Sequence, residues 1–211
     1  MISLENILFI LLSYLTGSFP SAVWVGKTFF NKDVREYGSG NAGATNTFRV
    51  LGKKAGIPVL LMDVFKGCLS VNYILFVSNV SSLSPSQYFE IQLAFGISAV
   101  IGHLFPIYTG FRGGKGIATL LGLLIGLSPY AAIIALIVFI TVVIITKYVS
   151  VSSIIASISY PIIIFFIFED SNYSLQLFSI FVPILSLITH QKNIERLFRG
   201  EENKISFEKN N

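Results

Sequence analysis

Apolar runs and short polar segments alternate along the whole chain. Seven runs are rich in Leu, Ile, Val and Phe, and they cover residues 4–25, 57–77, 90–108, 116–127, 129–146, 149–168 and 175–189. A helix needs roughly 17 to 25 apolar residues to cross a bilayer. The fourth run is shorter than that, and we expect a tilted or partial helix there, or one buried among its neighbours. The pattern predicts an all-α polytopic membrane protein with seven transmembrane helices.

The basic residues lie on alternate connections between these runs. They follow the first, third, fifth and seventh runs, whereas the connections at 78–89, 128 and 169–174 contain neither Lys nor Arg. Cytoplasmic loops of membrane proteins carry an excess of Lys and Arg. This distribution therefore predicts an N-terminus outside the cell and a C-terminus in the cytoplasm.

The composition agrees with a membrane protein. Of the 211 residues, 53% are hydrophobic and 12% are charged, whereas soluble domains have about 25% charged residues. The net charge of +4 follows from the topology, so we expect no nucleic-acid partner. The only cysteine, Cys68, lies in an apolar run, which excludes a disulfide framework. We expect one domain over 1–200, whose first run is a retained span and not a signal peptide, and a polar cytoplasmic tail over 201–211.

One charged pair interrupts the second apolar run. Asp63 and Lys66 stand three residues apart in MDVFKG, so they share a helical face. Charges inside a membrane segment face the interior or a polar cavity. The pair is either a structural ion pair between helices or a wall of the active site.

Four polar clusters lie at the predicted cytoplasmic boundary, and the first is GSGNAGATNTFRVLG at 38–52. Its glycines allow positive φ and close backbone approach, and its Arg49 offers a planar fork suited to phosphate. The alternative is a polar loop with helix caps. The candidate residues here are Gly38, Ser39, Gly40, Asn41, Thr45, Asn46 and Arg49.

The second cluster is FRGGKGIATLLG at 111–122, just before the short fourth run. Free N–H groups at a helix N-terminus attract anions, and Lys115 adds a charge in the same turn. We expect phosphate or acyl-phosphate binding by Arg112, Gly113, Gly114, Lys115 and Gly116, with a basic turn that only sets topology as the alternative. Upstream, His103 is expected to be a satisfied interhelical residue and not a base.

The third and fourth clusters are HQKNIERLFRG at 190–200 and KYVSVSS at 147–153. His190 and Asn193 share a helical face, and His190 suits proton transfer or donation to a substrate oxygen. Glu195 and Arg199 are spaced to pair. The serines near Ser150 are expected either to cap a helix or to contact a phosphate.

Six segments in this order resemble the acyl-phosphate-dependent glycerol-3-phosphate acyltransferases of bacteria, the PlsY family. They are GSFPSA (17–22), GSGNAGATNTFRVLG, DVFKG (63–67), GHLFPIYTGFRGGKGIAT (102–119), KYVSVSS and HQKNIERLFRG. The resemblance implies transfer of a fatty acyl group from acyl phosphate to the 1-hydroxyl of sn-glycerol 3-phosphate. The products would be lysophosphatidic acid and inorganic phosphate, in the first step of bacterial phospholipid synthesis.

Site roles are also implied by the resemblance. Ser39 and Arg49 match the first motif of the family, Lys115 the second, and His190 with Asn193 the third, while Glu195 is expected to be structural. Two positions depart from the family pattern. Arg112 stands where lysine is common, and Ser152 stands where glycine is usual, which puts the role of the fourth cluster in doubt.

The residues themselves favour catalysis by positioning and electrostatic stabilisation. No zinc ligand set or Ser-His-Asp arrangement is evident, so we expect neither a metal, a cofactor nor an acyl-enzyme. The expected partners are acyl phosphate, glycerol 3-phosphate, the lipid bilayer of the bacterial plasma membrane and the soluble enzyme that supplies acyl phosphate. One alternative is an acyltransferase that depends on acyl-CoA or acyl-carrier protein. The other is a transporter of a phosphorylated solute, which would place its site near the membrane midplane.

Overall fold

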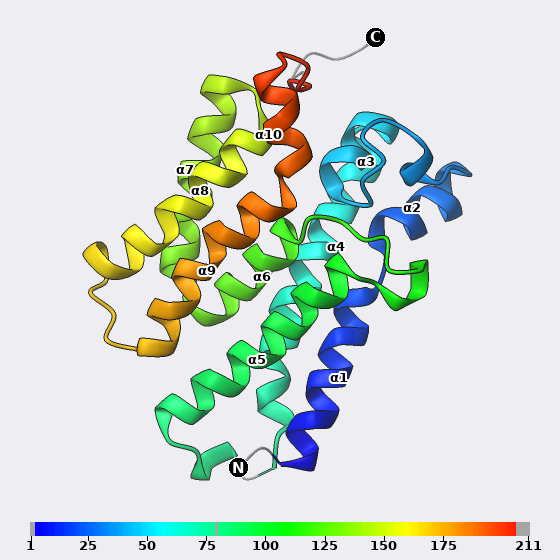
Figure 1. Ribbon diagram of the computed structural model, residues 1–211. Coiled ribbons are helices and arrows are strands. Elements are labelled where there is room, and N and C mark those ends of the chain that lie inside the picture. The colour runs from blue at the N-terminus through cyan, green and yellow to red at the C-terminus, as the bar shows by residue number, and fades with distance from the viewer. Residues whose placement is uncertain (1–2, 79, 206–211) are drawn as a thin grey trace. The chain divides into compact units, whose positions relative to one another are not determined.

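The computed structural model describes residues 3–78 and 80–205, and none of these residues lies in a strand (Figure 1). The α-helices are α1 (Leu4–Ser18), α2 (Ser21–Phe30), α3 (Ala44–Leu51), α4 (Lys53–Asn72), α5 (Pro85–Leu104), α6 (Ile117–Leu127), α7 (Pro129–Thr146), α8 (Val149–Ile162), α9 (Tyr173–Thr189) and α10 (Gln191–Phe198). Short turns of 3-10 helix are η1 (Val34–Glu36), η2 (Tyr73–Phe76), η3 (Val80–Ser82) and η4 (Ile107–Thr109), and η5 (Ile163–Ile167) is a π-helical turn. The predicted all-α class is confirmed.

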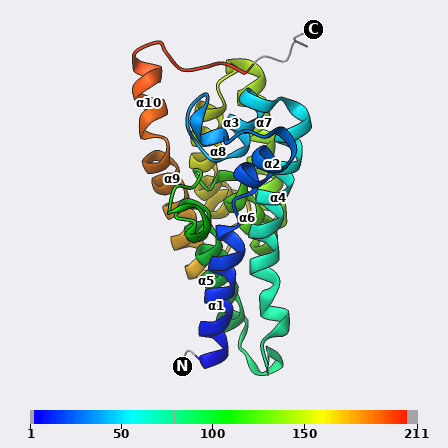
Figure 2. The ribbon, with the colours of Figure 1, turned by 90° about the vertical axis from the view of Figure 1, so that its right-hand side faces the viewer.

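The chain forms two compact units, and the single domain over 1–200 stays a prediction. Unit 1 is Met1–Pro129 and unit 2 is Tyr130–Asn211. In unit 1, α1 packs along α5, and α4 packs against α3, α5 and α6; both views show α1 beside α5 (Figures 1 and 2). In unit 2, α8 packs along α9, and α10 continues from α9.

The apolar helices account for four to six membrane spans among the described residues. Four helical segments are long and apolar enough to span alone, namely 53–76, 85–109, 129–146 and 149–167. Two bent pairs also pass as spans if each pair is one, α1 with α2 (41°) and α9 with α10 (60°). Helix α6 has 11 residues, as the short fourth run predicted. The count of seven spans and the orientation of the termini stay predictions.

The first predicted run, 4–25, is not one straight helix. Helix α1 ends at Ser18 and α2 begins at Ser21, because the ring of Pro20 removes a backbone donor and disfavours helical backbone at the residue before it. The rings of Phe19 and Trp24 pack across the break at 5.8 Å between centroids. The residues at the bend, 17–21, lie near the polar loop that follows α2, since both line one pocket.

Glycines set the close approach of two helix pairs in unit 1. A Cβ at Gly17 or Gly102 would collide with backbone atoms of the facing helix, Ala99 and Tyr14 respectively, so α1 and α5 are in backbone contact. Gly67 and Gly122 do the same for α4 and α6, against the carbonyl oxygens of Thr119 and Val64. Small residues are the usual means by which membrane helices approach closely. These contacts fix where α6, and the polar turn before it, begins.

We predict that Gly122→Ala destabilises the protein more than Gly126→Ala on the same helix. The methyl group at 122 meets the Val64 carbonyl, which is backbone and cannot turn away, whereas at 126 it meets only the side chain of Val71, at 2.9 Å. Overpacking of this kind costs about 1–3 kcal/mol. Thermal unfolding in detergent checks the order, and equal midpoints for the two variants would contradict the backbone contact.

Candidate functional site

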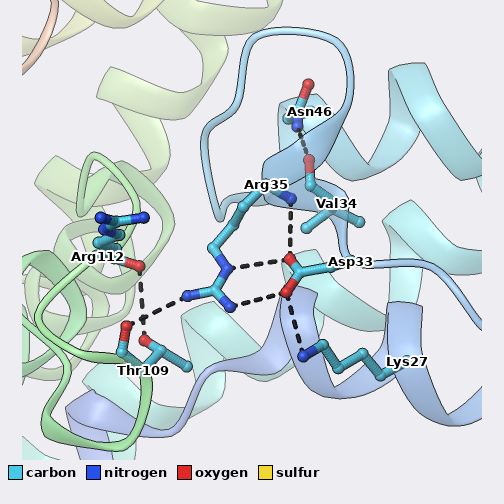
Figure 3. A network of polar contacts seen from close by, with 7 residues as sticks. All are labelled: Lys27, Asp33, Val34, Arg35, Asn46, Thr109 and Arg112. Atoms are coloured by element: carbon cyan, nitrogen blue, oxygen red, sulfur yellow. Dashed lines mark hydrogen bonds and ion pairs between the residues drawn. The ribbon is translucent and has the colours of Figure 1, made fainter.

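The loop after α2 is built around the carboxylate of Asp33. Its Oδ1 accepts hydrogen bonds from the Arg35 backbone N–H and from Nε, both at 3.0 Å, and its Oδ2 accepts one from the Arg35 terminal nitrogen at 2.7 Å. Lys27 Nζ lies 3.3 Å from the same Oδ2 (Figure 3). The Arg35 side chain, helped by Lys27, holds the pKa of Asp33 well below its usual range. The carboxylate is therefore ionised at any physiological pH, and the network around it is permanent.

Asn46 holds the rest of this loop in shape. Its buried amide nitrogen donates to the carbonyls of Val34 (2.8 Å) and Tyr37 (3.1 Å), and its oxygen accepts from the backbone N–H of Ser39 (2.9 Å). Both donors of the amide are used inside the protein. Asn46, a candidate substrate-binding residue, is thus placed as a brace of the loop.

Two glycines of the first cluster have the backbone that the sequence suggested. Gly38 has φ +62° and Gly40 has φ +72°, a region that side chains with a Cβ rarely adopt. Gly43 differs, since it is the N-cap of α3 with φ −127°. The positive φ values turn the backbone around Ser39, which is exposed.

Arg49 is the exposed cation of the first cluster. It lies on α3, and within the described residues its guanidinium makes no hydrogen bond or ion pair with the protein. Thr45 is also exposed on α3, and Asn41 is half-buried in the loop before it. Arg49 is therefore available to a phosphate ligand.

The second cluster packs onto the end of α5. The backbone N–H of Gly114 donates to the His103 carbonyl at 3.2 Å. A Cβ at Gly113 would collide with the same carbonyl, and one at Gly114 with the His103 ring. Gly116, with φ +80°, is the N-cap of α6, so the half-buried Lys115 directly precedes the free N–H groups of that helix.

The structure brings the first two clusters together in unit 1. Arg35 donates to the Thr109 carbonyl at 3.2 Å, and Thr109 Oγ1 lies 3.5 Å from the Arg112 carbonyl oxygen (Figure 3). A small pocket joins the same segments, and it is lined by Gly17, Ser18, Phe19, Pro20, Ser21, Ala42, Lys66, His103, Pro106, Thr109, Arg112, Gly113 and Gly114. Ala42 belongs to the first cluster, and 112–114 to the second. Neither Arg49 nor Lys115 is part of this lining.

The predicted pair in the second apolar run is present as a buried ion pair. Lys66 Nζ lies 2.9 Å from Asp63 Oδ1, and both side chains are buried. Ser21 and His103 surround the same carboxylate, although the sequence analysis gave neither of them a part in it. The residues that it missed are 42 and 40 positions away in the chain, and no local pattern connects them to Asp63.

His190, in unit 2, is buried at the junction of α9 and α10. Its Nδ1 lies 2.8 Å from the Ser186 carbonyl oxygen, which only accepts, so Nδ1 carries the proton. In the neutral ring, Nε2 is then the nitrogen with a lone pair. The expected i,i+3 partner, Asn193, follows on the first turn of α10 and is also buried.

A carboxylate that the sequence analysis missed joins the third and fourth clusters. Glu202 accepts hydrogen bonds from Asn193 Nδ2 (2.6 Å), Ser150 Oγ (2.8 Å) and Arg196 Nε (2.9 Å). Burial raises the pKa of Glu202, but these three donors outweigh it and keep the pKa below its ordinary value. Ser150 therefore does not cap α8, and Ser152 and Ser153 bond to carbonyls four residues back.

The segment predicted as a polar tail is partly packed. Besides the contacts of Glu202, the Ile205 N–H donates to the Lys147 carbonyl at 2.8 Å, and Lys204 Nζ lies 5.3 Å from the centre of the Tyr148 ring. The predicted polar tail is therefore packed against its own unit at 202–205, and 206–211 lie outside the described residues. The cue in the sequence was an acidic pair, Glu201 and Glu202, directly after a Gly200 turn.

Glu195, the expected structural carboxylate, pairs with Arg199 at 2.6 Å as its spacing predicted. Both side chains are more than half exposed, and such surface pairs contribute little. The carboxylate that contacts Asn193 is Glu202.

Comparison with known proteins gives a consistent result. Residues 7–200 match the family model described as Glycerol-3-phosphate acyltransferase. Curated relatives of that name from Staphylococcus saprophyticus and Staphylococcus aureus are 44% and 45% identical over 201 residues, covering 95% of this chain and 98% of theirs.

Two solved structures of PlsY, an integral membrane glycerol 3-phosphate acyltransferase, are similar to the fold. The glycerol 3-phosphate form has a TM-score of 0.84 at 31% identity, covering 95% of this chain and 96% of that one. The lysophosphatidic acid form has a TM-score of 0.80 at 30% identity, covering 95% of both chains.

We predict that Glu202→Gln lowers both the stability of the protein and any activity that depends on Asn193 and Ser150, by several-fold for the activity. The amide removes the charge that Arg196 faces and presents an N–H where a donor already points. Glu195→Gln is the matched control and is expected to leave both nearly unchanged. Equal losses in the two variants would contradict the role of Glu202.

The stability difference between wild type and Glu202→Gln is expected to depend on pH. Because the folded-state pKa lies below the ordinary value of 4.5, the contribution of the carboxylate is fully present above pH 4.5 and is lost as the pH falls through the lowered pKa. Unfolding midpoints measured from neutral to acid pH check this.

Proposed function

The chain belongs to the glycerol-3-phosphate acyltransferase family and is a membrane acyltransferase, and we propose that its acyl donor is acyl phosphate. The reaction moves a fatty acyl group to the 1-hydroxyl of sn-glycerol 3-phosphate and gives lysophosphatidic acid and inorganic phosphate. The observation that carries the proposal is the family match over 7–200, which contains all four polar clusters. The resemblance to the acyl-phosphate-dependent enzymes supplies the donor.

The chemistry requires little covalent help from the protein. The hydroxyl oxygen attacks the carbonyl carbon of a mixed anhydride, the bond from that carbon to the phosphate oxygen breaks, and the hydroxyl proton ends on the released phosphate. The protein has to neutralise two phosphates, align the hydroxyl and stabilise the developing oxyanion. Cationic and N–H donors fixed by packing suit this task, because they need no reorganisation during the reaction.

We assign phosphate binding to Ser39, Arg49 and Lys115. Arg49 is exposed and makes no contact with protein groups in the described residues, and its fork matches two phosphate oxygens. Lys115 precedes the N-terminus of α6, where N–H groups and the helix dipole favour an anion. Ser39 lies between two glycines of positive φ and is exposed, so its hydroxyl is accessible to a ligand, whereas its N–H is already bonded to Asn46.

We assign orientation of glycerol 3-phosphate to His190 and Asn193. Ser186 fixes the tautomer of His190, and Glu202 fixes the amide of Asn193. The group that first takes the hydroxyl proton is either His190 or a phosphate oxygen of the substrate, and the proton then passes to the released phosphate.

The same proposal places the site at the cytoplasmic side of the bacterial plasma membrane. The basic loops that carry Arg49, Arg112 and Lys115 are cytoplasmic by charge distribution, and glycerol 3-phosphate is water-soluble. The acyl tail of the donor is apolar and suits the lipid side of a helical membrane protein. A soluble enzyme would supply the acyl phosphate.

We expect the purified protein to release phosphate and form lysophosphatidic acid from acyl phosphate and glycerol 3-phosphate, and to be inactive with acyl-CoA. Phosphate release and product formation are followed together in the same reaction. Activity with acyl-CoA alone would overturn the donor assignment. Solute flux in vesicles without product would support a transporter.

We predict that Arg49→Ala and Lys115→Ala each raise the apparent KM for a phosphate-bearing substrate, lower turnover, or both. Loss of one preorganised charge lowers kcat/KM by about 10²-fold. Lys53→Ala, a change at another exposed cation just after α3, is the control and should retain wild-type kinetics. Wild-type values in the two site variants would remove these residues from the site.

A further inference from the structure

A buried carboxylate links three helices of unit 1. Asp63 Oδ1, on α4, accepts a hydrogen bond from Ser21 Oγ of α2 at 2.9 Å and lies 2.9 Å from Lys66 Nζ. The Nδ1 of His103, on α5, lies 3.6 Å from the same oxygen. Lys66 also donates to the Phe19 carbonyl at 3.0 Å, at the break between α1 and α2. The mechanism proposed above uses none of these groups.

His103 connects this cluster to the second phosphate-seeking loop. Its ring points Nδ1 toward Asp63, and its Nε2 edge faces Gly114, where an added Cβ would collide with that nitrogen. The backbone of the same histidine accepts the hydrogen bond of the Gly114 N–H at 3.2 Å. The ring and the carbonyl group of His103 thus form one contact surface beneath Gly113 and Gly114, which we call the floor of the loop.

The groups around this floor are buried. His103, Lys66 and Asp63 are 6%, 5% and 1% exposed, and polar and ionic contacts away from water are strong. Rotation of the His103 ring would separate it from Asp63 and open a void beneath Gly114. Lys115 follows Gly114 immediately, so a shift of the floor moves its cation and the start of α6.

We propose that His103, held by Asp63, is a positioning residue that sets the location of the GGKG loop (113–116) and hence of Lys115. The inference deepens the proposed function, on which it rests in one respect: Lys115 is taken to bind a substrate phosphate. The inference also explains why residue 114 is glycine. The imidazole of His103 leaves no room for a Cβ there, whereas the φ of Gly114 is not positive. His103 acts through the loop and does not touch the substrate.

The test is a cycle of Gly114→Ala, His103→Asn and the double variant, with Ser98→Ala as control. Asparagine keeps a donor toward Asp63 but removes the ring edge beneath Gly114. Ser98 is a buried polar residue of the same helix, and its hydroxyl donates to the Ile10 carbonyl on α1 at 2.8 Å, away from the loop. The first readout is amide hydrogen exchange of the peptide over 110–117 without substrate.

We expect Gly114→Ala and His103→Asn each to speed exchange in this peptide, while α4 and the first turns of α5 keep wild-type exchange and Ser98→Ala leaves the loop unchanged. In the double variant the added methyl group has room, so Gly114→Ala should cost less than in the wild-type background. A kinetic readout on the same set should show the KM for glycerol 3-phosphate rising about tenfold in each single variant, with non-additivity in the double. Turnover should change less than KM.

Unchanged loop exchange in both single variants would overturn the inference, as would additive effects in the double variant. If His103→Asn does not fold, exchange in Gly114→Ala alone decides, because a loop that does not rest on the ring would tolerate the methyl group. The exchange readout does not involve substrate, so absence of acyltransferase activity would contradict the proposed function and leave the test of His103 intact.

Discussion

A carboxylate in the apolar interior of a membrane protein is stable only if a cation and hydrogen-bond donors lie beside it, and Asp63 has both at its Oδ1. Lys66 supplies the charge from the next helical turn, and Ser21 supplies a hydroxyl across the interface. Separating such a pair leaves a buried charge unpaired, which is far more costly than the pair is worth. The hydrogen bond from Ser21 joins α2 to this pair on α4, and His103 extends the cluster to α5 and the GGKG loop.

Two other carboxylates, outside the apolar segments, gather donors around them in the same way. Asp33 gathers Lys27 and Arg35 in the loop after α2, and Glu202 gathers Ser150, Asn193 and Arg196 in unit 2. Each carboxylate accepts hydrogen bonds from donors that could otherwise bind a phosphate, and it holds those side chains in fixed orientations. Among the described residues, no carboxylate engages Arg49 or Arg112. The distinction separates cations that brace the loops from cations without a carboxylate partner.

Glycine serves two different physical purposes in unit 1. At Gly38, Gly40 and Gly116 the backbone has positive φ and forms turns that project polar groups. At Gly67, Gly122 and Gly114 the backbone lies so close to a neighbour that no Cβ fits. Positive φ shapes the polar loops, and close backbone contact fixes the helices and side chains against which those loops pack. A chain with few charged residues thus positions its polar loops mainly by backbone proximity.

The sequence by itself determined the helical class, the approximate limits of the apolar segments, the Asp63–Lys66 and Glu195–Arg199 pairs and the four polar clusters. All of these depend on spacing within one element, where helical periodicity decides which side chains are neighbours. The family followed from the order of short motifs along the chain. The fine roles of the site residues remain predictions from that order.

Tertiary structure alone decided which groups meet across elements. Glu202 reaches Ser150 from 52 positions away, Ser21 reaches Asp63 from 42, and the amide of Asn46 bonds to the Val34 carbonyl from 12. Such contacts depend on how helices cross and where a chain folds back, and no local pattern encodes them. The sequence therefore identified the clusters. Only the packing of the helices showed that Glu202 joins 147–153 to 190–200, and that residues of 38–52 and 111–122 line one pocket.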